Sequence, residues 1–167
     1  SVGGVKNVEL KWTASREGRL SSFLRGELNL STGLMNKLKW GDFLRVNGTP
    51  QRTNYRVLPG DIITVAFPAE IPDYPAEDGK LSILYEDEAI LAVDKPAGML
   101  IHPSRAKNTG TLANLVAGYY RKTGQRMAFH PLTRLDRDTF GIVLLAKNAY
   151  VHTRLQENGA KKTYHAL

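Results

Sequence analysis

The fold is decided by the stretch RLDRDTFG at residues 134–141, which runs directly into the apolar segment IVLLAK at residues 142–147. Two aspartates and two arginines within five positions precede a run rich in β-formers, which is typical of a polar site at the mouth of a buried strand. We expect Asp136 to have apolar walls on one side and arginine side chains on the other, so that it stays ionised yet poorly hydrated. A carboxylate in that setting is a usable nucleophile.

A solvated turn with ordinary ion pairs is the other interpretation of this stretch, and spacing alone does not separate the two. Residue identity favours a functional site. RLDRDTFG resembles the RLDxxTSG motif of the RluA-like pseudouridine synthases, which convert uridine in RNA into its C-glycoside isomer. The resemblance implies that Asp136 is the catalytic residue. Phe140 stands where the family usually has Ser, a departure that concerns local packing more than chemistry.

The composition of the 167-residue chain fits one domain or two small ones, with 42% hydrophobic residues to form packed cores. No apolar run approaches the roughly 20 residues that a membrane span needs, and no signal-like segment opens the chain. The absence of cysteine excludes disulfides and thiolate metal sites. The four histidines show no tight ligand spacing, so no metal site is expected. We therefore expect a soluble, cytoplasmic protein without a membrane or metal partner.

The charge balance is basic, with 23 Lys and Arg against 16 Asp and Glu, a net charge of +7 and a pI near 9.7. Such a balance favours polyanionic partners, because cations that neutralise phosphates release counterions. A modest positive charge also simply aids solubility, so the charge alone leaves both interpretations open.

The first part of the chain has the pattern of two short helices and a small sheet. Leu20, Phe23 and Leu24 form one helical stripe, and Ser31 is a plausible N-cap for a second helix. Asn47-Gly48 is a strong signal for a tight turn between strands. The remaining expected elements are a strand at 5–14, the second helix at 32–39, and strands at 43–46 and 62–67.

Residues 19–65 resemble the small RNA-binding domain called the alpha-L motif, through GRLSSFLR, RVNG and VLPGDIITV. Ser21 stands where that family often has Asp. The resemblance implies that basic residues on the second helix and neighbouring turns face RNA, although each could equally be a solvated surface charge. The implied RNA-binding residues are Arg25, Lys37, Lys39, Arg45 and Arg52.

The segment PAEIPDYPAEDGK at residues 68–80 is rich in proline and has no periodicity, which is typical of a semi-extended linker. We therefore predict an RNA-binding domain at 1–70, a linker at 71–80 and a catalytic domain at 81–167. The expected fold class is α+β, with a small helix-helix-sheet domain before an incomplete mixed, mainly antiparallel β domain with flanking helices. The strands expected after the linker are 81–85, 90–93 and 142–147, and the helices are 111–120 and 149–156.

Two further motifs resemble the same synthase family. DEAILAVDKPAGMLIHP at residues 87–103 matches its opening motif, although a tight inter-strand connection explains that segment equally well. Its turn implies supporting roles for Lys95 and Gly98. The segment KTY at residues 162–164 matches the family's KxY motif, in which the Tyr packs against the target base. That match implies a role for Tyr164, supported by Lys162.

Uridine isomerisation breaks a carbon–nitrogen glycosidic bond, rotates the base and joins carbon to carbon. We expect Asp136 to supply the anionic group, Tyr164 the aromatic wall, and Arg134 with Arg137 the positive charge for phosphates. Arg134 could instead fill the space that an extruded base leaves. Whether Asp136 attacks the base or the sugar, or removes a sugar proton, stays open. The reaction needs no metal, nucleotide or redox cofactor.

The leading interpretation is thus a monomeric RNA pseudouridine synthase acting on ribosomal or transfer RNA. Family members continue past the KxY motif, so we expect this chain to be part of a longer protein and, alone, to bind RNA but isomerise poorly. The alternative is a non-catalytic RNA-binding protein. A weaker one is a glycoside hydrolase, for which Asp138 is the nearest second acid, although in extended chain it would face away from Asp136.

Overall fold

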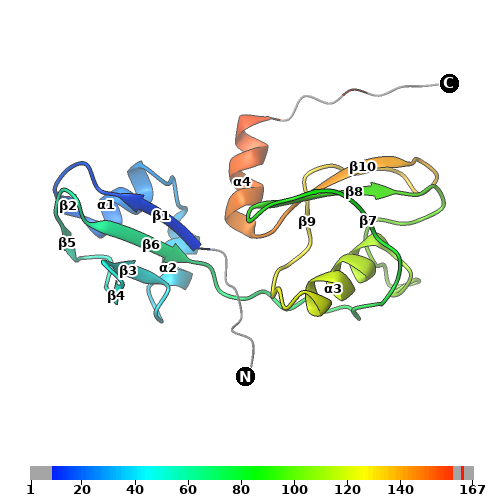
Figure 1. Cartoon of the computed structure of the whole chain (residues 1–167), viewed down its shortest axis with the longest axis horizontal. Coiled ribbons are helices and arrows are strands. Elements are labelled where there is room, and N and C mark those ends of the chain that lie inside the picture. Colours follow the sequence, from blue (N-terminus) through cyan, green and yellow to red (C-terminus); the bar gives the residue numbers. More distant parts are fainter. Residues whose placement is uncertain (1–8, 160–162, 164–167) are drawn as a thin grey trace. The chain divides into compact units, whose positions relative to one another are not determined.

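The computed structural model describes residues 9–159 and residue 163 of the chain. The chain divides into two compact units, and the division falls between Pro68 and Ala69 (Figure 1). None of the helices in the described residues is long and apolar enough to cross a membrane. Helices and antiparallel strand pairs together confirm the predicted α+β class.

The first unit combines two short helices with a four-stranded antiparallel sheet of order β1-β6-β3-β4 and a small β2-β5 pair. Helix α1 forms because Leu20, Phe23 and Leu24 share one face, and all three are completely buried. Ser31 caps α2 as predicted, since its hydroxyl oxygen accepts from the Leu34 N–H at 3.2 Å. The elements are β1 (Glu9–Thr13), β2 (Gly18–Arg19), α1 (Leu20–Gly26), α2 (Thr32–Leu38), β3 (Leu44–Val46), β4 (Thr49–Pro50), β5 (Arg56–Val57) and β6 (Ile62–Ala66).

The predicted Asn47-Gly48 turn joins β3 to β4, and both residues have positive φ, at 52° and 81°. The Asn47 side chain also reaches β6. Its Nδ2 donates to Asp61 at 2.9 Å, and its Oδ1 accepts from the Ile62 N–H at 2.9 Å. The turn is therefore tied to β6, the strand that pairs with β3 on its other side.

The second unit is built on an antiparallel sheet of order β7-β8-β10-β9. Val93 of β8 and Val143 of β10 are paired and completely buried, because the inner face of the sheet packs on α3 (Figure 1). Thr111 caps α3 through a capping box with Asn114. The elements are β7 (Ser82–Glu86), β8 (Ile90–Lys95), α3 (Leu112–Lys122), β9 (His130–Pro131), β10 (Gly141–Ala146) and α4 (Ala149–Asn158).

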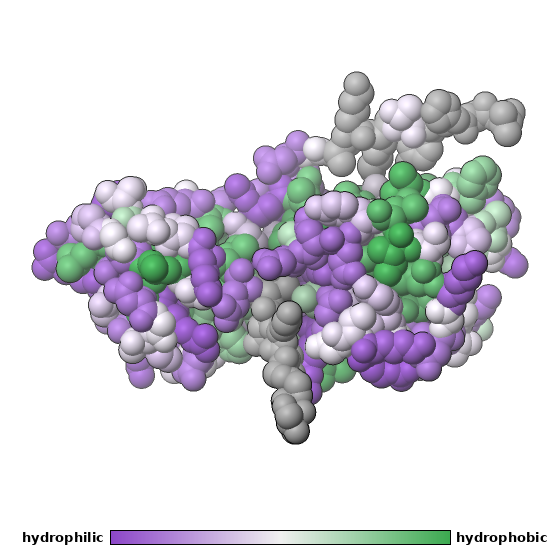
Figure 2. All heavy atoms as spheres, viewed as in Figure 1, coloured by the Kyte–Doolittle hydropathy of each residue, from purple (hydrophilic) through white to green (hydrophobic). Residues whose placement is uncertain are grey.

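Apolar side chains also stand on the surface of this sheet. Leu84, Tyr85 and Ile142 are all more than half exposed, at 53%, 53% and 63%. Figure 2 shows hydrophobic side chains gathered over the strands of the second unit. The alternation along β10, with Val143 inward and Ile142 outward, explains why part of an apolar strand faces solvent.

Residues 69–80 pack against the second unit rather than forming a separate linker at 71–80. The Glu77 N–H donates to the Asn114 carbonyl oxygen at 2.9 Å, and the Asn114 side chain donates to the Pro75 carbonyl oxygen at 2.9 Å. Gly118 of α3 lies so close that a Cβ there would sit 1.8 Å from the Glu77 carbonyl oxygen. Composition indicated an extended segment, but the contacts that hold it come from a helix some 40 residues away.

Candidate functional site

The loop between β9 and β10 carries the polar stretch from which the sequence analysis began. Leu135 packs against the core of the second unit, while Asp136 is exposed. The Thr139 N–H donates to the Asp136 carbonyl oxygen at 3.1 Å, which closes a turn over residues 136–139. One partly buried leucine thus anchors a loop whose next side chain is exposed.

Lys95, at the end of β8, is hydrogen-bonded to this loop, and its side chain is completely buried. Its Nζ donates to the carbonyl oxygens of Pro96 at 3.0 Å, Met99 at 2.9 Å and Arg137 at 3.1 Å. These three bonds use all the donors of an ammonium group, which is how a buried lysine is accommodated. The lysine joins the turn after β8 to the loop before β10.

Gly98 makes the second connection between the two segments. Its φ of +83° favours glycine, and its N–H donates to the Arg137 carbonyl oxygen at 2.8 Å. The Arg137 Nε donates in return to the Gly98 carbonyl oxygen at 3.3 Å. Two segments about 40 residues apart are therefore held in one fixed arrangement beside Asp136.

The charges of this site centre on Lys95. Burial lowers the pKa of Lys95, and the carboxylates of Asp138 and Asp136 oppose that shift. Both carboxylates therefore act on the same ammonium group. The expectation that Asp138 faces away from Asp136 assumed extended chain. The chain is not extended here, because the turn over residues 136–139 interrupts the alternation of side chains.

The structure describes only some of the residues that the sequence predicted for this site. Arg134 is exposed on the same loop as Asp136. Asp136 itself is exposed among the described residues, so it is not the poorly hydrated carboxylate that the sequence predicted. Lys162 and Tyr164 lie outside the described residues.

The predicted RNA-binding residues of the first unit are spread over several elements. Arg25 lies in the last turn of α1 and Lys37 in the last turn of α2. Arg45 lies on β3, with its guanidinium 3.5 Å from the Glu9 carboxylate. Lys39 and Arg52 come together, because both line a cavity of about 500 Å³.

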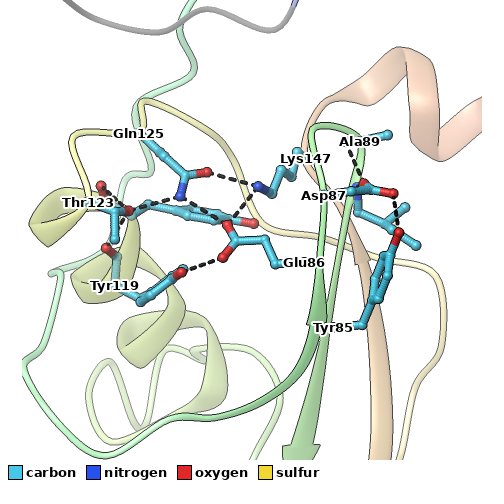
Figure 3. A network of polar contacts seen from close by, with 10 residues as sticks. Tyr85, Glu86, Asp87, Ala89, Tyr119, Thr123, Gln125 and Lys147 are labelled. Carbon is cyan, nitrogen blue, oxygen red and sulfur yellow. Dashed lines mark hydrogen bonds and ion pairs between the residues drawn. The ribbon is translucent and has the colours of Figure 1, made fainter.

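A partly buried polar network in the second unit was not predicted (Figure 3). The Glu86 carboxylate accepts from Lys147 Nζ at 2.7 Å, from Gln125 Nε2 at 3.0 Å and from the Tyr119 hydroxyl. Lys147 Nζ also donates to Gln125 Oε1 at 3.0 Å. The network joins the end of β7 to α3 and β10. The sequence signal was Lys147, a charged residue directly after a buried strand. Nothing near it in the sequence identified Glu86, its partner 61 positions earlier.

The network shifts the pKa of its acidic members. Burial alone would raise the pKa of Glu86, but the hydrogen bonds from Lys147, Tyr119 and Gln125 outweigh it and lower that pKa. The hydrogen bond to Glu86 raises the pKa of Tyr119 to about 12. Glu86 is therefore held as a carboxylate and Tyr119 as a neutral phenol.

The chain is similar to a known protein family and to several curated proteins. Residues 89–167 match the family model described as RNA pseudouridylate synthase. The uncharacterized RNA pseudouridine synthase YjbO of Bacillus subtilis is 40% identical over 147 residues, which cover 84% of this chain and 52% of that protein. YlyB, described in the same words and from the same organism, is 38% identical over 160 residues, 90% of this chain and 52% of that protein.

A relative with a more specific name is the ribosomal large subunit pseudouridine synthase D of Pseudomonas aeruginosa. It is 35% identical over 99 residues, which cover 57% of this chain and 31% of that protein. The chain spans about half the length of the curated relatives it matches over most of its own sequence.

Proposed function

The chain belongs to the RNA pseudouridylate synthase family, whose RluA-like branch its motifs resemble, and we propose that the protein isomerises uridine in RNA to pseudouridine with Asp136 as the catalytic carboxylate. One observation carries the assignment of the residue. Asp136 is exposed on a loop that is fixed from behind by Lys95 and by the paired backbone of Gly98 and Arg137. A reacting carboxylate needs both access to substrate and a fixed position.

The reaction needs no further reactant, because substrate and product are isomers. The bond from N1 of uracil to C1′ of ribose breaks, the base turns, and a bond from C5 to C1′ forms. C5 then loses its proton and N1 takes one up, so that no atom is gained or lost overall. We assign Asp136 the anionic role beside the ribose and base, and Arg134 the positive charge beside a phosphate. Tyr164 would hold the freed base by stacking.

The substrate class that we propose is ribosomal RNA first and transfer RNA second. The first proposal is supported by the relative named for the ribosomal large subunit. The net charge of +7 suits a phosphate-rich partner of either kind.

The first unit is proposed to bind that RNA. Its basic side chains on α1, α2 and β3 would contact phosphates, which position an RNA without reading its sequence. The residues proposed for these contacts are Arg25, Lys37, Lys39, Arg45 and Arg52, together with Arg137 on the loop of the second unit.

Replacing Asp136 by Asn in the full-length protein tests the proposal. The amide keeps the size of the side chain but removes its charge, so tritium release from RNA labelled at C5 of uracil should fall by about 100-fold or more. RNA affinity should stay within about twofold, because an exposed loop carboxylate is not a phosphate contact.

Asp138→Asn is the matched control, since it removes a carboxylate from the same turn and should keep most of the activity. Normal tritium release by Asp136→Asn would contradict the assignment. If the unaltered full-length protein binds RNA but forms no pseudouridine, an RNA-binding function without catalysis remains.

A further inference from the structure

A cavity of about 500 Å³ opens on the first unit, and none of its lining residues is one that we assign to catalysis. One wall is the turn after α2, at residues 39–42, and the other is formed by residues 50–52, 54 and 55. Its volume lies within the range of about 300–1,000 Å³ that is typical of small-ligand sites. Both walls belong to the same unit, so the cavity is complete within it.

The first wall carries an exposed aromatic ring next to a turn that requires glycine. Trp40 is 70% exposed, which is unusual for so large an apolar side chain. Gly41 holds the turn, because its φ of +117° disfavours other residues and a Cβ there would lie 2.9 Å from the Phe43 ring. Lys39 Nζ lies 5.3 Å from the centroid of the Trp40 ring. A cation therefore lies beside a solvent-exposed indole.

The second wall is held by backbone hydrogen bonds to the start of α1. The Leu20 N–H donates to the Tyr55 carbonyl oxygen at 2.9 Å, and the Ser21 N–H donates to the Thr53 carbonyl oxygen at 2.8 Å. The Tyr55 N–H donates to the Arg52 carbonyl oxygen at 2.9 Å, which closes the loop on itself. The wall thus keeps its shape without a ligand.

The polar side chains of this wall are available to a ligand. Within residues 9–159 and 163, no hydrogen bond or ion pair engages the side chains of Gln51, Arg52 or Asn54. Two amides, which can each donate and accept, therefore face the cavity together with a free guanidinium.

We propose that this cavity binds one unpaired nucleotide of single-stranded RNA, with its base stacked on Trp40. This inference rests on the proposed function, which supplies RNA as the substrate, and adds a base-binding site outside the catalytic loop. Lys39 and Arg52 would neutralise the flanking phosphates, and Gln51 and Asn54 would meet the edge of the base. Stacking on an aromatic ring with cations nearby is how unpaired nucleotides are held.

An acidic peptide is the other ligand that two cations could attract. The flat ring of Trp40 and the paired amides match a nucleobase better than a carboxylate, and Asp42 on the cavity wall opposes a ligand whose only feature is negative charge. A nucleotide offers N–H and hydroxyl donors to that carboxylate, whereas a glutamate side chain offers none.

The test compares two probes on the full-length protein, a six-nucleotide uridine RNA and an abasic ribose-phosphate oligomer of the same length. The unaltered protein should bind the base-bearing RNA more tightly. Trp40→Ala should weaken binding of that RNA about tenfold, within the range measured for base stacking, and leave the abasic oligomer within about twofold. Trp40→Phe should restore most of the difference. Leu58→Ala, an exposed apolar side chain in the same unit, should change neither.

The proposal is overturned if Trp40→Ala binds both oligomers as the unaltered protein does, with an unchanged unfolding midpoint. It is also overturned if a six-residue polyglutamate binds as tightly as the RNA and depends equally on Trp40. The activity of Asp136→Asn separates this failure from that of the proposed function. If Asp136→Asn is inactive while Trp40→Ala binds both oligomers as the unaltered protein does, the proposed nucleotide site is wrong and the proposed function still holds.

Discussion

At the scale of single residues, Lys95 explains how an exposed carboxylate can be held in position. Its ammonium group lies below the loop, has no exposed surface, and bonds three backbone carbonyl oxygens from two segments. The resemblance suggested a supporting role for this residue. Its burial could not be predicted from sequence, because a lysine at a strand end is normally solvated.

Replacing Lys95 by Met should destabilise the second unit by about 1–3 kcal/mol, because the variant loses all three hydrogen bonds that the buried ammonium group donates to backbone carbonyl oxygens. Urea unfolding followed by circular dichroism measures the change. Lys80→Met removes an exposed lysine from the same unit and should change stability by less than about 0.5 kcal/mol. An equal effect of both replacements would contradict the role given to the buried ammonium group.

At the scale of secondary-structure elements, the Glu86 network joins β7, α3 and β10 around one carboxylate (Figure 3). Because the folded pKa of Glu86 is lowered, its contribution to stability is present above the ordinary value of 4.5 and is lost as the pH falls through the folded pKa. The network should therefore weaken in acid.

Glu86→Gln should lower the free energy of unfolding by about 1–3 kcal/mol at neutral pH, because Lys147 is left buried without a counter-charge. The difference from the unaltered protein should shrink as the pH falls below 4.5. Urea midpoints measured across the acid range test this, with Glu88→Gln on the same hairpin as control. A difference that is independent of pH would show that the charge of Glu86 is not its cause.

Helix starts and hairpins were predictable because their causes are local. Ser31 and Thr111 cap the helices that follow them, and Asn47-Gly48 forms its turn, each through atoms within three residues. The Glu86 network and the packing of residues 69–80 depend on partners 33–61 positions away, which periodicity does not register. The exposure of Asp136 likewise follows from the turn after it, not from the alternation assumed for a strand.

At the scale of the whole molecule, the division between Pro68 and Ala69 separates two units whose stabilities should respond independently. Gly118→Ala places a Cβ 1.8 Å from the Glu77 carbonyl oxygen and should destabilise the second unit by about 3 kcal/mol or more. Hydrogen exchange resolved along the chain should show faster exchange in α3 and unchanged exchange in α1.

Gly26→Ala is the reciprocal variant. Apart from the neighbouring residues and the backbone of its own helix, no atom lies within 4 Å of a Cβ at that position in α1, so Gly26→Ala should stabilise the first unit by about 0.5–1 kcal/mol and leave α3 unchanged. If either replacement altered exchange in both units, the two would unfold together and the division would have no energetic meaning.

The hairpin between β3 and β4 also bears on how long the protein stays chemically intact. Asn followed by Gly is prone to deamidation, in which the glycine nitrogen attacks the asparagine side-chain carbonyl and ammonia leaves. Here Asp61 and Ile62 hold the two ends of the Asn47 amide, which restricts the rotation that the attack requires. These hydrogen bonds should therefore slow deamidation at a turn whose sequence is prone to it.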